Sequence, residues 1–329
     1  MSNLRNHASS TEAVTEIPVF FSTDDRYLPF LDVAIASLIE HASRAYRYRL
    51  VILHTGLSSD GMEKILQRCD ENFLIDFEDI SHEVENIRDA FQDVYHFSVV
   101  TYYRLFIASL FPQYRKIVYL DSDLVVLGDV SQLYHTELNG AILAAAPEQY
   151  VRNTPAFRLY AEKALNVDPD GYVNAGVLVL DLDQFRRHRI EERFVELITR
   201  YDFDLLDPDQ AYLNYLCDGL IHVLPNGWNK EPLPLPLEGE LNLVHYALYK
   251  KPWQYDDVMY GEHFWRYAEK SPFYGEIAER RASFGDRERA EKEATADEIL
   301  QHAKSIADSD STFAKKLAKE DHDHGTVRA

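Results

Sequence analysis

Two carboxylates one residue apart, in Asp121-Ser122-Asp123, are the clearest candidates for chemistry in this sequence. The residues before them, 116–120, form an apolar run that predicts a buried strand ending at the first aspartate. Both carboxylates can then bind one hard divalent cation, and phosphate oxygens and water would complete its octahedral shell. An aspartate that begins a turn, beside another that caps a backbone group, is the alternative interpretation. The motif alone leaves both interpretations open.

His245 offers a third metal ligand of a different kind. It follows an apolar run, 241–244, that predicts another strand, and it precedes two lysines, Lys250 and Lys251. A neutral imidazole beside two carboxylates shifts the preferred ion from Mg²⁺ toward Mn²⁺. The lysines could neutralise a departing diphosphate. For the histidine taken singly, a core imidazole bonded to the backbone is the alternative.

Strand and helix patterns alternate around these residues. Apolar runs typical of strands lie at 17–22, 49–54, 73–77, 116–120, 141–146 and 173–180, and helical spacing lies at 31–39, 60–69, 98–111, 209–216, 258–268 and 272–284. The alternation predicts an α/β layer with a mainly parallel sheet. Ligands bind such sheets at the carboxyl ends of the strands. Prolines in 231–237 exclude a central strand or helix, so we expect a rigid loop that could act as a lid over the site.

The bulk composition limits the classes of function and the compartment. The formal net charge is −21, and such a surface repels phosphodiester backbones, so we expect no nucleic-acid partner. The two cysteines, Cys69 and Cys217, suit a reducing compartment. The N-terminal residues are polar and lack the apolar core of a signal peptide, and no apolar run approaches the roughly 18 residues that span a bilayer. We therefore expect a cytoplasmic protein without a transmembrane segment.

Several segments together resemble glycosyltransferase family 8, which includes bacterial lipopolysaccharide galactosyl- and glucosyltransferases and glycogenin. They occur in the family's order between about Ile17 and Trp253. The resemblance implies an α/β, nucleotide-sugar-binding GT-A-type fold with a mixed, mostly parallel sheet and a helical C-terminal appendage. The segments are Lys-Ile-Val-Tyr-Leu before Asp121-Ser122-Asp123, Tyr172-Val173-Asn174-Ala175-Gly176-Val177-Leu178, Asp209-Gln210, and His245 with Lys251-Pro252-Trp253.

The resemblance implies a metal site beside a nucleotide site. Asp121, Asp123 and His245 match the family's metal ligands, with Mn²⁺ as the ion and Mg²⁺ as a substitute. Asp24 and Tyr27 match the uracil contacts. The other donor-binding positions of these two regions are Asp25, an acidic neighbour in the nucleotide loop, together with Ser22, Thr23 and Ser122.

The resemblance also implies a sugar site. Arg104 matches the arginine that reaches the donor sugar and its phosphate, and Lys251 matches the lysine on the diphosphate. Two pairs complete the site: Asn174 with Ala175 in the turn that holds the sugar, and Asp209 with Gln210 beneath it, which are the candidate catalytic residues.

Three positions depart from the family pattern. Arg26 stands where bacterial relatives often carry Asn, which affects the ribose contact. Glu148 stands where an Asp usually binds donor-sugar hydroxyls, and its extra methylene would shift the sugar preference. Leu248 replaces a Gly at a point where the backbone approaches phosphate closely. These departures bear on donor identity and efficiency more than on the reaction class.

We therefore expect a retaining, metal-dependent hexosyltransferase that moves glucose or galactose from a UDP-sugar to an acceptor hydroxyl on a glycan, glycolipid or glycoprotein. Without a convincing nucleophile, retention implies a same-face substitution in which the leaving phosphate accepts the incoming proton. A sugar nucleotidyltransferase is one alternative, but it normally has a glycine-rich, basic loop near the first strand, and residues 21–25 are acidic and free of glycine. A non-catalytic or self-glycosylating relative is the other.

The domain boundaries follow from changes in composition. We expect residues 1–15 to be a disordered leader and 16–284 to be the glycosyltransferase catalytic domain. Residues 285–329 are charged and poor in aromatics, which predicts a tail that is helical over 288–307 and disordered from 309. We expect this tail to be dispensable for donor chemistry, and any membrane association to be peripheral.

Overall fold

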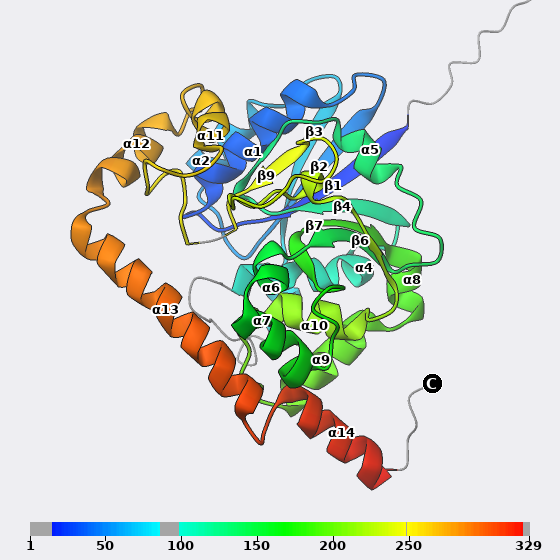
Figure 1. Ribbon diagram of the computed structural model, residues 1–329. Coiled ribbons are helices and arrows are strands. Elements are labelled where there is room, and N and C mark those ends of the chain that lie inside the picture. Colours follow the sequence, from blue (N-terminus) through cyan, green and yellow to red (C-terminus); the bar gives the residue numbers. More distant parts are fainter. Residues whose placement is uncertain (1–14, 86–98, 248, 325–329) are drawn as a thin grey trace, which may run out of the picture.

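Runs of branched and aromatic residues form the strands of a central sheet. The computed structural model describes residues 15–85, 99–247 and 249–324. Within them, seven strands pair in the order β3-β2-β1-β4-β7-β6-β8 (Figure 1). Neighbours are antiparallel only at β4–β7 and β6–β7, so the expected mixed, mostly parallel sheet is confirmed. The strands are β1 (Glu16–Ser22), β2 (Arg47–His54), β3 (Phe73–Asp79), β4 (Lys116–Leu120), β6 (Leu143–Pro147), β7 (Val173–Asp181) and β8 (Ile221–Val223).

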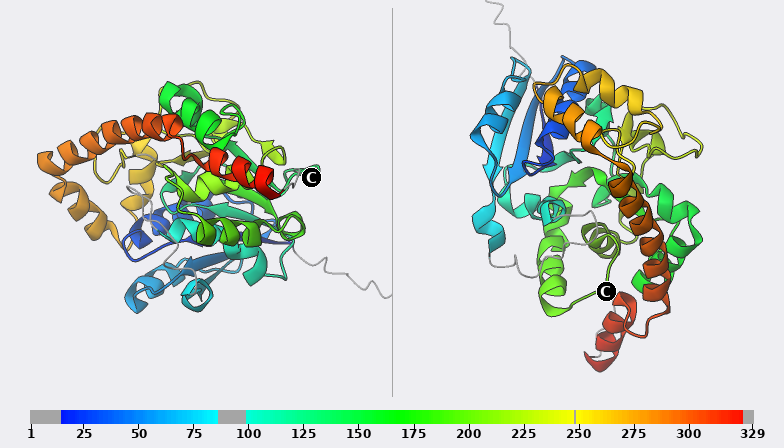
Figure 2. Two further views of the ribbon diagram at one scale, coloured as in Figure 1. Left: turned by 90° about the horizontal axis from the view of Figure 1, so that it is seen from below. Right: turned by 90° about the vertical axis from the view of Figure 1, so that its left-hand side faces the viewer.

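Helices cover both faces of this sheet (Figure 2). Those before β7 are α1 (Leu28–His41), α2 (Ser59–Leu66), α3 (Ser81–Val84), the 3₁₀ helix η2 (Val99–Phe106), α4 (Ile107–Leu110), α5 (Val130–Tyr134), α6 (Gln149–Asn153), α7 (Pro155–Leu159) and the π-helical η3 (Tyr160–Leu165). Those after β7 are α8 (Leu182–Arg187), α9 (Ile190–Arg200), α10 (Pro208–Leu216), the 3₁₀ helix η4 (Asn226–Trp228), α11 (Gly261–Ala268), α12 (Tyr274–Ser283), α13 (Asp286–Asp308) and α14 (Phe313–His324).

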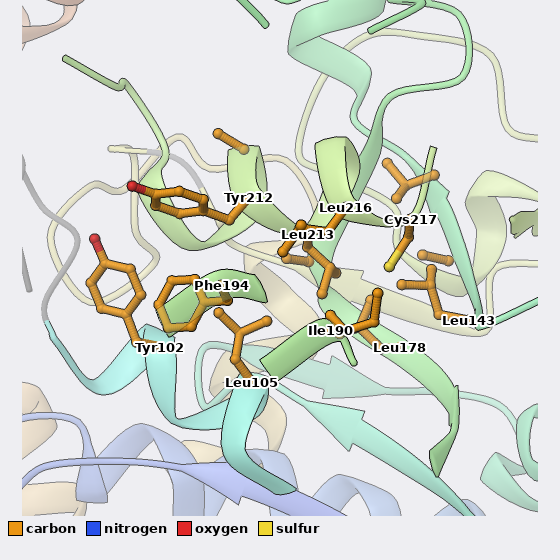
Figure 3. Packing of buried hydrophobic residues seen from close by; sticks show 14 of the residues in the cluster. Tyr102, Leu105, Leu143, Leu178, Ile190, Phe194, Tyr212, Leu213, Leu216 and Cys217 are labelled. Atoms are coloured by element: carbon orange, nitrogen blue, oxygen red, sulfur yellow. The ribbon is translucent and has the colours of Figure 1, made fainter. Parts of the chain in front are cut away.

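Alternation along the central strands divides the core between the two faces of the sheet. On β4, Ile117 and Tyr119 belong to one hydrophobic cluster, and Val118 and Leu120 belong to the other. This is the period of two that a strand buried on both faces requires. The first cluster lies under α8, α9 and α10, where Phe194 packs against tyrosines with ring centroids 5.1 and 5.7 Å away (Figure 3).

A second, two-stranded sheet holds the residues on either side of the expected metal site. Strand β5 (Leu124–Val126) begins directly after Asp123 and pairs antiparallel with β9 (Leu243–His245), so that Leu124 faces His245. The amide of Tyr246 also donates to the carbonyl of Asp123 at 2.9 Å. This pairing brings His245 beside Asp121 and Asp123, although His245 and Asp123 are 122 residues apart in the sequence.

The C-terminal residues form an arm that packs against the domain. Figures 1 and 2 show α13 running along one side of the molecule from α12 to α14. Ile299, Ala303 and Ile306 follow helical spacing and pack into the first core cluster, and Phe313 of α14 is 2% exposed. The helix predicted over 288–307 is therefore present. The expected disorder from 309 is wrong for α14, because an aromatic anchor docks its first turn on the core.

Some expectations from the sequence fall outside the described residues, namely the leader over 1–14, Leu248 and the first residue of the helix expected at 98–111. The rest of that last segment is wound more tightly than expected, as η2 followed by the short α4. Among the helices of the described ranges, none has both the length and the apolar character needed to cross a bilayer.

We expect Phe313→Ala to detach the arm and to lower the free energy of unfolding by about 3 kcal/mol, the usual cost of removing a buried aromatic ring. The ring packs 4.2 Å from that of Phe203 and 4.6 Å from that of Tyr215, measured between centroids. Urea unfolding monitored by fluorescence measures the change. Tyr274→Ala, at a ring that is 45% exposed, is the matched control and should cost less than about 1 kcal/mol. Equal small losses would show that the arm is not part of the cooperative fold.

Candidate active site

A cleft of about 590 Å³ lies at the carboxyl ends of β1 and β4, and this volume suits a small-molecule ligand. It is lined by every site residue expected from the sequence except Asp25, whose carboxylate accepts hydrogen bonds from the amide and hydroxyl of Ser58 instead, both at 2.9 Å. The expected residues in the lining are Ser22, Thr23, Asp24, Tyr27, Arg104, Asp121, Ser122, Asp123, Glu148, Asn174, Ala175, Asp209, Gln210, His245 and Lys251.

Asp121, Asp123 and His245 form a cluster with the composition of a metal site. One ligand atom from each lies within 4.8 Å of the others. His245 Nε2 is 3.1 Å from Asp123 Oδ1 and 3.7 Å from Asp121 Oδ2. Two carboxylates and an imidazole are donors that a divalent transition ion accepts, and they leave coordination positions for other ligands.

Asn229 orients the imidazole of His245, and sequence reasoning missed it. Its side-chain nitrogen donates to Asn174 Oδ1 at 2.8 Å, so its oxygen must accept from His245 Nδ1, 2.9 Å away. A proton is thereby assigned to Nδ1, which leaves Nε2, the atom that faces the carboxylates, as the one that can bind a cation. Such an outer partner fixes the tautomer of many metal-binding histidines. The only sequence signal was an asparagine in a loop of ordinary composition.

Gly176 leaves the space that the cluster needs. A Cβ at this position would lie 2.2 Å from His245 Cε1 and 2.6 Å from Asp121 Oδ2. Any side chain would therefore enter the space between the ligands. The donor set, the fixed tautomer and this cradle all fit a divalent cation held by Asp121, Asp123 and His245.

Two buried cations compensate the charge of the aspartates. Lys251 Nζ lies 2.6 Å from Asp123 Oδ2 and also donates to the carbonyl of Tyr246. Burial opposes the charge of both groups, but their mutual attraction outweighs it. As a result, the pKa of Asp123 lies well below its usual range, and the pKa of Lys251 is raised.

Arg104 pairs with carboxylates from two different elements. Its Nη2 lies 2.9 Å from Asp121 Oδ1, its Nε lies 3.3 Å from Asp209 Oδ2, and it also donates to the carbonyl of Ala175. Burial disfavours the guanidinium charge, but Asp121, Tyr119 and Asp209 more than offset it and raise the pKa of Arg104. Arg104 therefore braces the floor of the cleft, whereas the sequence pointed only to a contact with donor sugar and phosphate.

Hydrogen bonds hold the polar residues of the inner wall in single orientations. Glu148 accepts from the amide of Tyr150 at 3.1 Å, which caps α6, and from Asn174 Nδ2 at 2.6 Å. Gln210 Oε1 accepts from the amide of Ala175 at 2.9 Å. The added methylene of Glu148 is thus accommodated by its position as the N-cap of α6.

The loop after β1 lies beside an aromatic group that adjoins Lys251, whose Nζ is 5.8 Å from the centroid of the Trp253 ring. Tyr27 meets Trp253 edge-on with ring centroids 6.3 Å apart, and Trp253 stacks on Phe30 at 3.6 Å. Asp24 receives the amide of Tyr27 and the guanidinium of Arg26, the latter at 2.8 Å. An aromatic face and a carboxylate can read the face and the edge of a base.

The outer wall comes from the arm and not from the proline-rich loop. Described residues of α13, among them Lys292 and Asp297, line the cleft, whereas none from 231–237 does. The lid expected at 231–237 is therefore not found in the lining of this cleft. Burial and the nearby charge of Lys251 lower the pKa of Lys292. The tail expected to be dispensable therefore forms part of the candidate site.

Gly176→Ala should abolish high-affinity metal binding while the fold persists, because the new methyl group must displace the His245 ring or the Asp121 carboxylate. We expect at least a tenfold loss of Mn²⁺ affinity, the scale of other changes that disturb ligand orientation, measured by calorimetry on the metal-free protein. Gly275→Ala, where the added Cβ meets nothing within 4 Å, is the control and should bind as wild type does. Unchanged affinity in Gly176→Ala would place the ion elsewhere.

Comparisons with known proteins identify the family of this chain and its fold. The family model described as Glycosyl transferase family 8 matches residues 18–257, a range that contains every expected site residue. The chain is 28% identical over 254 residues to lipopolysaccharide 1,2-glucosyltransferase of Escherichia coli (strain K12), covering 71% of this chain and 72% of that protein.

Solved structures show the same fold. The galactosyltransferase LgtC, in complex with donor and acceptor sugar analogues, matches with a TM-score of 0.65 at 23% identity, over 78% of this chain and 96% of that one. The bifunctional WbbM matches with a TM-score of 0.71 at 24% identity over 82% of this chain, which spans about half (52%) of the WbbM chain. At these identities the likeness establishes the expected GT-A-type fold alone. With the family match over most of its length, this chain belongs to glycosyltransferase family 8.

Proposed function

We propose that this chain is a retaining hexosyltransferase that moves glucose or galactose from a UDP-sugar to an acceptor hydroxyl of a glycan, glycolipid or glycoprotein. The observation that carries the proposal is the convergence of Asp121, Asp123 and His245 on the same cleft as Gln210, in a family 8 glycosyltransferase. The names of its relatives, a lipopolysaccharide glucosyltransferase and a galactosyltransferase, support a hexose donor. The family match favours this over a sugar nucleotidyltransferase.

We assign a divalent cation to Asp121, Asp123 and His245, with Mn²⁺ as the ion and Mg²⁺ as a substitute. The imidazole in the donor set supports Mn²⁺ over the harder Mg²⁺. When bound, the ion would supply positive charge that stabilises the departing diphosphate. Lys251, fixed 2.6 Å from Asp123 Oδ2, adds a second positive charge at the same point. Since both charges are in place before the reaction, they need no reorganisation during it.

The nucleotide would lie between the metal cluster and the aromatic group of the nucleotide loop. Tyr27 offers its ring to the face of uracil, and Asp24 offers a carboxylate to the base edge. Because Arg26 pairs with Asp24 at 2.8 Å in the structure, binding of the base must share or displace that exposed ion pair, which costs little.

The sugar would lie above Gln210, whose amide oxygen can face positive charge at the anomeric carbon. Asp209 is a poor nucleophile here, because its carboxylate is 3% exposed and pairs with Arg104 at 3.3 Å. This supports a same-face substitution. The bond from the anomeric carbon to the phosphate oxygen breaks, the bond to the acceptor oxygen forms on that face, and the acceptor proton passes to the leaving phosphate.

Release of UDP from a panel of UDP-sugars with Mn²⁺ or Mg²⁺ tests the proposed function. We expect metal-dependent release from UDP-glucose or UDP-galactose, and we expect Asp123→Ala to abolish the metal dependence of UDP binding, since it removes one of three protein ligands. Calorimetry with and without Mn²⁺ measures the second effect. Asp218→Ala, at an exposed carboxylate, is the control. Manganese-dependent UDP binding that survives in Asp123→Ala contradicts the assigned site.

Gln210→Ala should lower kcat about 100-fold, the usual effect of losing one group that stabilises charge only in the transition state. The Kd for UDP-sugar and for Mn²⁺ should stay within about twofold of wild type, as expected for an interaction absent from the ground state. Gln132→Ala, at an exposed glutamine, serves as the control. Weakened UDP binding in Gln210→Ala would mean that this residue serves the nucleotide and not the sugar.

A further inference from the structure

Asp207 is a buried carboxylate beside the candidate site whose chemistry the proposed reaction does not use. It is 8% exposed and occupies the N-cap position of α10. An aspartate at this position ordinarily accepts a hydrogen bond from the first turn of its helix. Here the side chain makes no such bond. Its orientation therefore needs another explanation.

The carboxylate of Asp207 accepts three side-chain hydrogen bonds. Tyr160 donates to Oδ1 at 3.1 Å, Tyr172 donates to Oδ2 at 2.7 Å, and Gln210 Nε2 donates to Oδ2 at 2.7 Å. The Tyr160 oxygen accepts the amide of Leu206 at 3.2 Å, which leaves its own proton for Asp207. An ionised carboxylate is an acceptor only, so this arrangement suits its charged form.

The contact with Asp207 determines the orientation of the Gln210 side-chain amide, that is, the positions of its Nε2 and Oε1 atoms. Nε2 faces two anions, Asp207 at 2.7 Å and Glu148 at 3.5 Å, and Oε1 accepts from the amide of Ala175 at 2.9 Å. A flipped side chain would set an oxygen against the Asp207 carboxylate and an NH₂ group against the N–H of Ala175. Both contacts would be repulsive, so the charged form of Asp207 permits one orientation.

We propose that Asp207 is a positioning residue for Gln210: as a carboxylate it holds Nε2, so that Oε1 is the amide atom available to the donor sugar. The inference rests on the proposed function of Gln210. A neutral group at this position, such as a protonated Asp or an Asn, is both donor and acceptor. It would pair with either end of the amide, and the orientation of Gln210 would no longer be fixed.

The orientation of Gln210 should depend on pH, because it requires the ionised form of Asp207. Burial raises the pKa of Asp207 to about 7, hydrogen bonds from Tyr172 and Gln210 oppose the rise, and the charges of Glu148 and Asp209 add to it. Tyr160 and Tyr172 keep their protons, because burial and Asp207 hold their pKa values well above the usual range. Ionised Asp207 therefore predominates above pH 7, and kcat should rise with pH through this value.

Asp207→Asn tests the positioning role of Asp207, because asparagine has nearly the same shape as aspartate but carries no charge. We expect kcat for UDP-sugar hydrolysis to fall about tenfold with the Kd for UDP-sugar unchanged, because only an interaction of the transition state is weakened. The rise of kcat near pH 7 should also disappear. Asp218→Asn, at an exposed residue in the turn after α10, is the matched control and should keep both the rate and the pH profile of wild type. Wild-type kcat and an unchanged pH profile in Asp207→Asn would overturn the proposal.

A double-mutant cycle with Gln210→Glu tests the contact without any turnover. Gln210→Glu alone sets two carboxylates against each other and should lower Tm. Adding Asp207→Asn supplies a donor to the new carboxylate and should raise Tm again, a non-additive result. Additive changes in Tm would overturn the contact. If wild type turns over no UDP-sugar, the proposed function fails, while this cycle still decides whether Asp207 orients residue 210.

Discussion

The carboxylates of Asp121 and Asp123 lie close together and repel each other. The residues around them are arranged so that this repulsion is compensated. Each is matched by a buried cation: Arg104 lies 2.9 Å from Asp121, and Lys251 lies 2.6 Å from Asp123. Burial would disfavour all of these charges singly, but each pair is closely spaced and further hydrogen-bonded. The carboxylate of Asp123 is thereby held ionised, with its pKa well below the usual range.

This compensation constrains elements that are distant in the sequence. Arg104 comes from η2, Asp121 from the end of β4, and His245 from β9, whose register with β5 sets it opposite the residue after Asp123. Strand β7 runs between them and can pass only because Gly176 has no side chain to fill the space. A shift of one residue in any of these pairings would turn a ligand to the other face of its strand. Packing of the surrounding core therefore fixes the positions of Asp121, Asp123 and His245 in addition to stabilising the fold.

The C-terminal arm contributes residues to the outer wall of the cleft. Helix α13 is polar on one face and apolar on the other, and the apolar face docks beside the residues of the candidate site. A wall of this kind reduces the solvent around the charged groups, and Coulombic interactions strengthen as the local dielectric falls. Burial and the nearby charge of Lys251 lower the pKa of Lys292, so the arm lies within electrostatic reach of the residues around Asp123.

The sequence by itself determined the α/β class, most strands of the central sheet, and the family resemblance that singled out Asp121, Asp123 and His245. These depend on periodicity and motif order, which are local properties of the chain. Three features were decided only by the tertiary structure. Arg104 pairs with the carboxylates of Asp121 and Asp209, Asn229 orients the imidazole of His245, and α13 contributes to the lining of the cleft. Likewise, only the tertiary structure decided that the loop 231–237, expected as a lid, does not line this cleft. Which distant residues meet depends on how elements pack across the sheet, and neither composition nor spacing within one segment carries that information.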